Sequence, residues 1–164
     1  MLENSSALMS DLRSKGCLIM HVPIMFDKGH KEIGAAAGIL NGIQDGELFA
    51  KGAATDFHPS MKPNEDKDMI VTGKLGLCGF FSTNLDFLLR QKWIKNVILG
   101  GFLTNCCIES TMRTAYEHGY NVYTLKDCTA ATSVEAHNAA FEYSFGMFST
   151  ITNADEVKAA VVAA

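Results

Sequence analysis

Short apolar runs alternate with amphipathic segments along most of this 164-residue chain, and this alternation constrains its fold more than any other feature. Residues 17–22 and 97–100 are continuous apolar runs, as expected of strands that are covered on both faces. Segments 82–91 and 104–118 instead carry apolar residues at helical spacing. Such an alternation predicts an α/β protein with three layers and a mainly parallel sheet.

The sequence divides into a regular part and an irregular part. Residues 27–68 are rich in Gly and Ala and signal little regular structure, apart from a weak helix near 34–43. We treat residues 1–164 as one domain in which 27–68 form an irregular arm, and arms this long usually have a function. The other expected strands are 69–71, 121–125 and 148–151, and the other expected helices are 5–15, 133–143 (capped by Ser133) and a last one capped by Asn153.

Composition excludes several classes of function. Only 20% of residues are charged and the net charge is −4, which gives no electrostatic footprint for nucleic acid or for an anionic membrane. No apolar run approaches the length of a membrane span. The five cysteines lack the spacing of a zinc site or a disulfide framework, so we expect reduced thiols and a cytoplasmic protein. They are Cys17, Cys78, Cys106, Cys107 and Cys128.

Cys107 is the residue with the clearest chemical potential. It falls in the first turn of the helix that follows the 97–100 strand, and ligands in open α/β sheets bind at the carboxyl ends of the strands. Free amides and the positive end of a helix dipole favour a thiolate there, and the same amides can stabilise an oxyanion. Taken alone, this position also suits a small buried residue, and Cys106 is expected to turn toward the core.

Residues 101–119, GFLTNCCIESTMRTAYEHG, resemble the signature of the isochorismatase-like cysteine hydrolases. That family includes nicotinamidases, N-carbamoylsarcosine amidases, and ureidoacrylate and biuret hydrolases. The upstream motifs VTGK at 71–74 and STNLDFLL at 82–89 fit the same family, as does the stretch 123–133. The resemblance implies a Rossmann-like three-layer α/β/α fold and makes Cys107 the nucleophile.

The resemblance also implies roles for the neighbours of Cys107. Lys74 takes the place of the catalytic lysine, where its ammonium favours the thiolate and an anionic intermediate. The bond between Phe102 and Leu103 takes the place of a cis peptide, and the backbone amides of Leu103 and Cys107 are the implied oxyanion donors. Phe80 and Phe81 are candidate pocket residues, although such aromatic residues are more often core.

One part of the family pattern is not found. The family carries a catalytic Asp at the end of a central first strand, and this chain shows no matching stretch, so we expect that strand to be absent and the sheet to be divided. Asp27 is the only nearby carboxylate that the sequence offers. The absence of a match to the catalytic Asp leaves two alternatives open: an active hydrolase, or a weak or inactive homologue that serves as a ligand-binding or oligomeric subunit.

The resulting hypothesis is an enzyme that cleaves a carboxamide or ureido C–N bond of a small molecule through a cysteine thioester. No cofactor and no metal is expected. Asp56 and His58 have metal-binding chemistry, but they lie in the arm at a different place from the Asp-x-His pattern of some nicotinamidases. The resemblance further implies a homo-oligomer, either a dimer or a tetramer, with a small amide substrate as the ligand.

Overall fold

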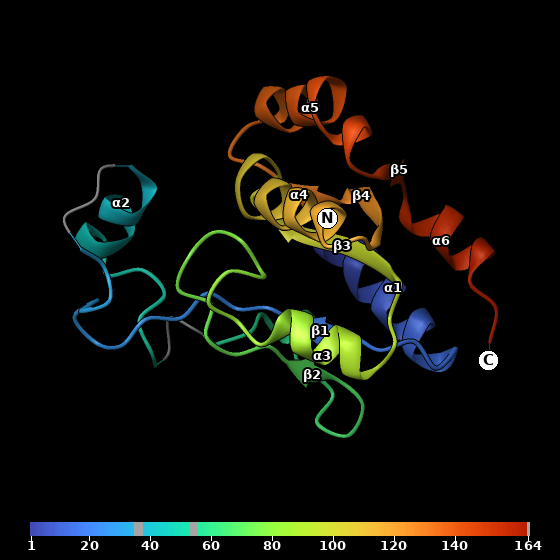
Figure 1. Cartoon of the computed structure of the whole chain (residues 1–164), viewed down its shortest axis with the longest axis horizontal. Coiled ribbons are helices and arrows are strands. Elements are labelled where there is room, and N and C mark those ends of the chain that lie inside the picture. The colour runs from blue at the N-terminus through green and yellow to red at the C-terminus, as the bar shows by residue number, and fades with distance from the viewer. Residues whose placement is uncertain (35–37, 53–55, 164) are drawn as a thin grey trace.

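Parallel strands covered by helices make up the computed structural model, which describes residues 1–34, 38–52 and 56–163 (Figure 1). One sheet pairs β1 with β2, and the other has the order β3–β4–β5, with parallel pairing throughout both. This arrangement confirms the predicted α/β class. The strands are β1 (Met20–His21), β2 (Met69–Ile70), β3 (Asn96–Phe102), β4 (Asn121–Ala130) and β5 (Thr150–Thr152).

Most helices begin where the sequence places a polar residue. Ser133 and Asn153 each accept an amide of the following first turn, as predicted. The helix expected from residue 82 begins later, because Thr83 accepts from the amide of Leu85 at 3.1 Å. The helices are α1 (Leu2–Ser14), α2 (Ile39–Asp45), α3 (Leu85–Gln91), α4 (Glu109–Glu117), α5 (Val134–Tyr143) and α6 (Ala154–Ala160), with short turns η2 (Pro59–Met61), η3 (Thr104–Ile108) and η4 (Phe145–Met147).

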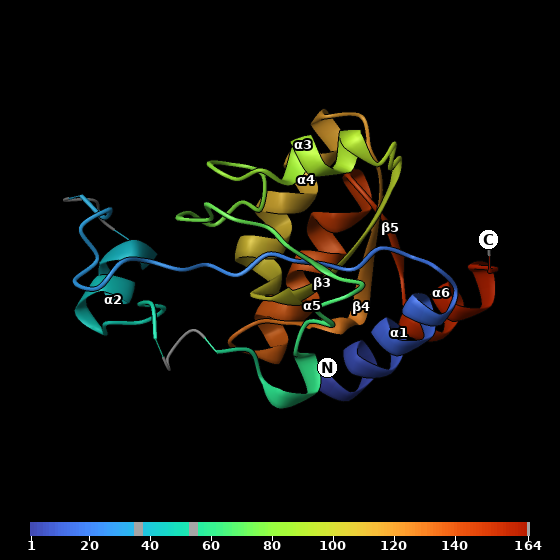
Figure 2. The ribbon, with the colours of Figure 1, turned by 90° about the horizontal axis from the view of Figure 1, so that it is seen from below.

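Two apolar clusters cover opposite faces of the strands. Val97 and Leu99 of β3 pack against a cluster built by α3, α4 and α5, whereas Ile98 packs against a cluster built by α1 and α6. Successive strand residues point to opposite faces, so the helices form two separate layers. Figure 2 shows α1 and α6 on one side of the strands and α4 on the other. The predicted three-layer arrangement is therefore present.

The sheet is divided between β1 and β3. Figure 1 places β1 between β2 and β3, yet in the described part of the chain no backbone ladder joins β1 to β3. The two sheets share the cluster on the α3–α5 side, where Val71 beyond β2 is fully buried and Met20 of β1 packs with it. Side-chain packing therefore holds the sheets together, at the place where the family resemblance puts a further strand.

The part of the arm around α2 projects from the sheets in both ribbon views, whereas η2 lies against α1 (Figures 1 and 2). The ring of buried His30 packs on that of buried Phe26 at 5.3 Å and hydrogen-bonds the carbonyl of Leu48 at 2.7 Å. α2 lies near the weak helix predicted at 34–43, of which residues 35–37 are outside the described residues. The described residues of the arm form few other regular elements and have contacts of their own. That the chain is one domain stays a prediction.

A buried ion-pair network ties α1 to both strands of the smaller sheet. The carboxylate of Asp68 is fully buried and accepts from Arg13 Nε at 2.8 Å, from His21 Nε2 at 2.9 Å and from the amide of Asn64 at 2.9 Å. Burial opposes ionisation, but these hydrogen bonds outweigh it and hold the pKa of Asp68 well below its usual range. This network fixes the amino end of β2.

We expect Asp68→Asn to lower the free energy of unfolding by about 3 kcal/mol, because it leaves the partly buried guanidinium of Arg13 without its carboxylate. Urea denaturation at neutral pH measures the change. Asp66→Asn, which alters an exposed carboxylate of the same loop, is the matched control and should be nearly neutral.

The same pair of variants tests the pKa of Asp68. A depressed native pKa contributes stability above the unfolded pKa of about 3.9, and that contribution declines as the pH falls further. The difference between the native protein and Asp68→Asn should therefore narrow below about pH 4. A difference that stays constant across this range would contradict the assignment.

Candidate active site

Cys107 lies in the turn that joins β3 to α4. This turn, η3, is a π-helical turn rather than the regular helix start that the sequence predicts, and Asn105 within it departs from helical geometry with φ −83° and ψ 21°. The carbonyl of Leu103 accepts from the amides of Cys106 and Ile108, the residues on either side of Cys107, at 3.2 Å each. Single π-turns are frequent at functional sites, and here one positions the candidate nucleophile.

The peptide bond between Phe102 and Leu103 is cis, at the position that the family resemblance implies. It directly precedes the π-turn, and Gly101 before it has φ 126°, a conformation that a residue with a Cβ rarely adopts. The amides of Leu103 and Cys107 therefore belong to one short, irregular segment. Their role as oxyanion donors stays a prediction.

Lys74 is buried rather than solvated, with 6% of its surface exposed. Its Nζ donates to the carbonyl of Gly76 at 2.6 Å, and its charge interacts most strongly with the thiol of Cys107, then with those of Cys78 and Cys106. Burial lowers the pKa of Lys74, while the thiols act in the opposite direction. The charges of Lys74 and Cys107 therefore act on each other, and their joint catalytic role stays a prediction.

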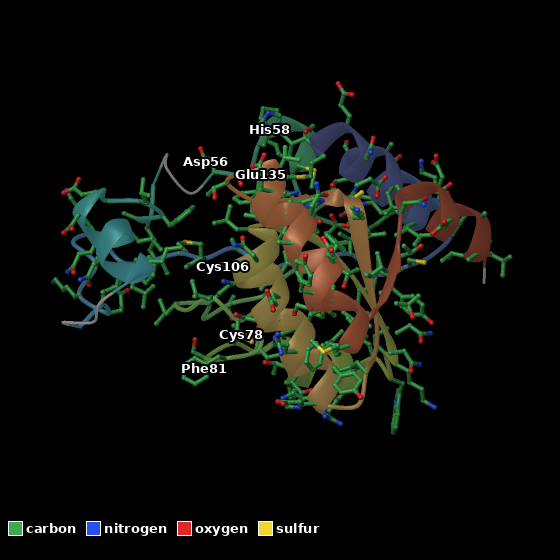
Figure 3. All side chains as sticks on the ribbon, turned by 90° about the horizontal axis from the view of Figure 1, so that it is seen from above. Asp56, His58, Cys78, Phe81, Cys106 and Glu135 are labelled. Carbon is green, nitrogen blue, oxygen red and sulfur yellow. The ribbon has the colours of Figure 1, made fainter. Side chains whose placement is uncertain are left out.

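Two further thiols share this site. Cys106, which the sequence analysis turned toward the core, is partly exposed, and burial together with the neighbouring Cys107 raises its pKa. Cys78 contacts the Thr114 hydroxyl at 3.3 Å and accepts from the amide of Phe80 at 3.3 Å. Figure 3 shows Cys78 and Cys106 on the side of the body that faces the arm. Sequence patterns had not connected Cys78 with the site.

Thr111 links the Lys74 loop to the nucleophile. Its hydroxyl donates to the carbonyl of Cys107 at 2.6 Å and accepts from the amide of Gly79 at 2.8 Å. No sequence motif had pointed to Thr111. The available signal was its spacing, because a threonine four residues after Cys107 on a helix can bond the carbonyl of that residue.

Only one of the two candidate pocket aromatics presents its ring to solvent. Phe80 is buried in the cluster on the α3–α5 side and stacks on His118 at 5.4 Å, and its role in a pocket stays a prediction. Phe81 is 75% exposed, and Figure 3 shows it extending away from the body. Adjacent residues of this loop point in different directions, which sequence alone does not reveal.

Acidic and metal-binding residues lie elsewhere in the described part of the chain. Asp27 forms an exposed ion pair with Lys51 in the arm, and His58 bonds Ser60 at 2.8 Å where η2 begins. Within residues 1–34, 38–52 and 56–163, no carboxylate pairs with Lys74 and no group of three His, Cys, Asp or Glu residues is placed to hold a metal. The same residues contain no helix of a length and hydropathy suited to crossing a membrane.

Comparisons with known proteins agree on one family. The Isochorismatase domain matches residues 1–156. The isochorismatase family protein YddQ of Bacillus subtilis is 27% identical over 133 residues, 81% of this chain and 65% of the relative. The ureidoacrylate amidohydrolase RutB of Acinetobacter baylyi is 38% identical over 96 residues, 58% of this chain and 39% of the relative. The chain therefore spans less than two thirds of either relative.

Solved structures show the same fold. A cysteine hydrolase from Pseudomonas syringae pv. phaseolicola superimposes with a TM-score of 0.87 at 20% identity, covering 96% of this chain and 78% of that one. An isochorismatase-like hydrolase from Alkaliphilus metalliredigens gives a TM-score of 0.81 at 24% identity, covering 97% and 83%.

We expect Lys74→Met to slow alkylation of Cys107 by iodoacetamide about tenfold, because a nearby cation stabilises the attacking thiolate. Peptide-level mass spectrometry measures the rate at this one thiol. Lys92→Met, which removes an exposed charge at the end of α3, is the control and should leave the rate unchanged. Equal alkylation rates for Lys74→Met and the native protein would show that the charge of Lys74 does not act on Cys107.

Proposed function

The chain belongs to the isochorismatase family, and from this membership we propose that it hydrolyses a carboxamide or ureido C–N bond of a small molecule through the thiol of Cys107. The observation that carries the proposal is the pairing of Cys107, in a π-turn after a cis peptide, with the buried ammonium of Lys74. The RutB relatives, named as ureidoacrylate amidohydrolases, support the ureido class of substrate.

The reaction proceeds in two halves. Sγ of Cys107 attacks the carbonyl carbon, and the amides of Leu103 and Cys107 donate to the resulting oxyanion. Collapse of this intermediate breaks the C–N bond, releases ammonia or an amine, and leaves a thioester on Cys107. Water then attacks the thioester, which yields the acid and restores the thiol. Lys74 stabilises negative charge in both halves because its ammonium is buried and its charge interacts with that of the Cys107 sulfur.

The proton of Cys107 has to reach the leaving nitrogen, which requires a group that accepts and then donates it. The family resemblance assigns that role to a carboxylate at the end of a strand. The described residues place no carboxylate in an ion pair with Lys74, and this observation favours the second candidate function, a ligand-binding or oligomeric subunit with little or no turnover. A homo-oligomer, a cytoplasmic location and the absence of any cofactor stay predictions.

Activity on a panel of small amides and ureido compounds decides between these functions, with released ammonia as the signal. We expect Cys107→Ala to abolish turnover, because no other sulfur can form the thioester from that position. Cys106→Ala is the matched control, since it removes the adjacent thiol and should retain most of the activity. Turnover that survives in Cys107→Ala would exclude the thioester route. Saturable binding without ammonia release would support the subunit function instead.

A further inference from the structure

Thr104 is the first residue of the π-turn and is completely buried. Its hydroxyl lies 2.9 Å from Nδ1 of His137, which comes from α5 more than thirty residues later. The hydrolytic mechanism described above uses neither side chain. A hydrogen bond between a fully buried hydroxyl and a partly buried imidazole still needs an explanation, because buried polar groups cost free energy unless they are satisfied.

The ring of His137 has a second contact. It packs on the ring of Phe141, one turn further along α5, with centroids 4.9 Å apart. A neutral ring protonated at Nε2 leaves Nδ1 as an acceptor for the Thr104 hydroxyl. The imidazole thus bridges α5 and the π-turn.

We propose that His137 is a positioning residue, whose neutral ring holds the hydroxyl of Thr104 and thereby fixes the π-turn that carries Cys107. Thr104 directly follows Leu103, whose carbonyl organises the amides on both sides of Cys107. A turn anchored at its first residue keeps these amides aligned with the thiol. The inference rests on the proposed role of Cys107 as a nucleophile.

The surroundings of His137 keep its ring neutral. Burial lowers its pKa, and the ammonium of Lys126, which lies 5.7 Å from the centre of the Phe141 ring, lowers it further. The other titratable groups on the elements packed against the ring are the thiols of Cys106 and Cys107 in η3, Tyr123, Asp127 and Cys128 in β4, and Glu135, Glu142 and Tyr143 in α5. Protonation would convert Nδ1 from an acceptor to a donor, so the Thr104 hydroxyl would have to turn and accept from it, which changes the geometry at the first residue of the π-turn.

The test measures alkylation of Cys107 by iodoacetamide across a pH series, by peptide-level mass spectrometry, so that no substrate is needed. In the native protein we expect a loss of reactivity below about pH 6.5 that exceeds the loss from protonation of the thiol alone. His137→Phe keeps a ring against Phe141 but has no acceptor. It should alkylate about fivefold more slowly at neutral pH and lack the extra acidic step.

Thr104→Val should reproduce the effect of His137→Phe, and the double variant should be no slower than either single one, because both remove the same bond. Thr104→Ser keeps the hydroxyl and should stay close to the native rate, so this pair carries the test if His137→Phe fails to fold. His118→Phe is the matched control, since that ring stacks on Phe80 outside the π-turn.

A native rate and an unchanged acidic step in His137→Phe or Thr104→Val would overturn the positioning role, as would additive losses in the double variant. The outcome is separate from that of the proposed hydrolysis. If the alkylation profile behaves as expected and no amide is turned over, His137 positions Cys107 in a binding protein and the hydrolase function fails alone.

Discussion

One apolar core holds the β1–β2 sheet against the β3–β4–β5 sheet, and the geometry of the candidate site depends on it. Lys74 follows β2, whereas Cys107 follows β3, so the two residues lie on different sides of the division. A continuous ladder would fix their relative position through backbone register. Here the buried cluster around Val71 and Met112 does so, and apolar packing is strong but has little directionality.

Hydrogen bonds of two threonine hydroxyls are directional, and they orient the segments that the apolar core only holds together. Thr111 bonds the amide of Gly79, in the loop after Lys74, and the carbonyl of Cys107. A hydroxyl can donate and accept at the same time, so one side chain connects the two sides of the site. Thr104 connects the π-turn to α5 through its hydrogen bond with His137. The π-turn is therefore held from both ends by threonines, and its position follows from side-chain hydrogen bonds as much as from the sheet.

Much of this could be predicted from the sequence, for identifiable reasons. The apolar run at 97–100 and the amphipathic stretch after it specify β3 and α4, because periodicity records which faces are buried. The caps at Ser133 and Asn153 act within a few residues, so local sequence suffices. A role for Lys74 in the site was expected because its motif is shared with a family, and its burial agrees with that role, since a lone lysine after a strand is normally solvated.

What the sequence could not reveal depends on contacts between distant segments. Phe80 and Phe81 are chemically alike, and only the stacking of Phe80 on His118 distinguishes a core ring from an exposed one. The bond between Thr104 and His137 likewise spans two elements with no shared local pattern.

Lys74 connects these observations to function. An ammonium this deeply buried loses its hydration, and a single carbonyl and three nearby thiols replace that solvation only in part. The lowered pKa of Lys74 follows from this loss of solvation. An anion that reaches the site gains the full attraction of a desolvated cation. The developing oxyanion and the thiolate are such anions, and both form at Cys107 during the proposed reaction. The lost solvation of Lys74 destabilises the folded protein, but it also stabilises the anionic states through which a thioester mechanism has to pass.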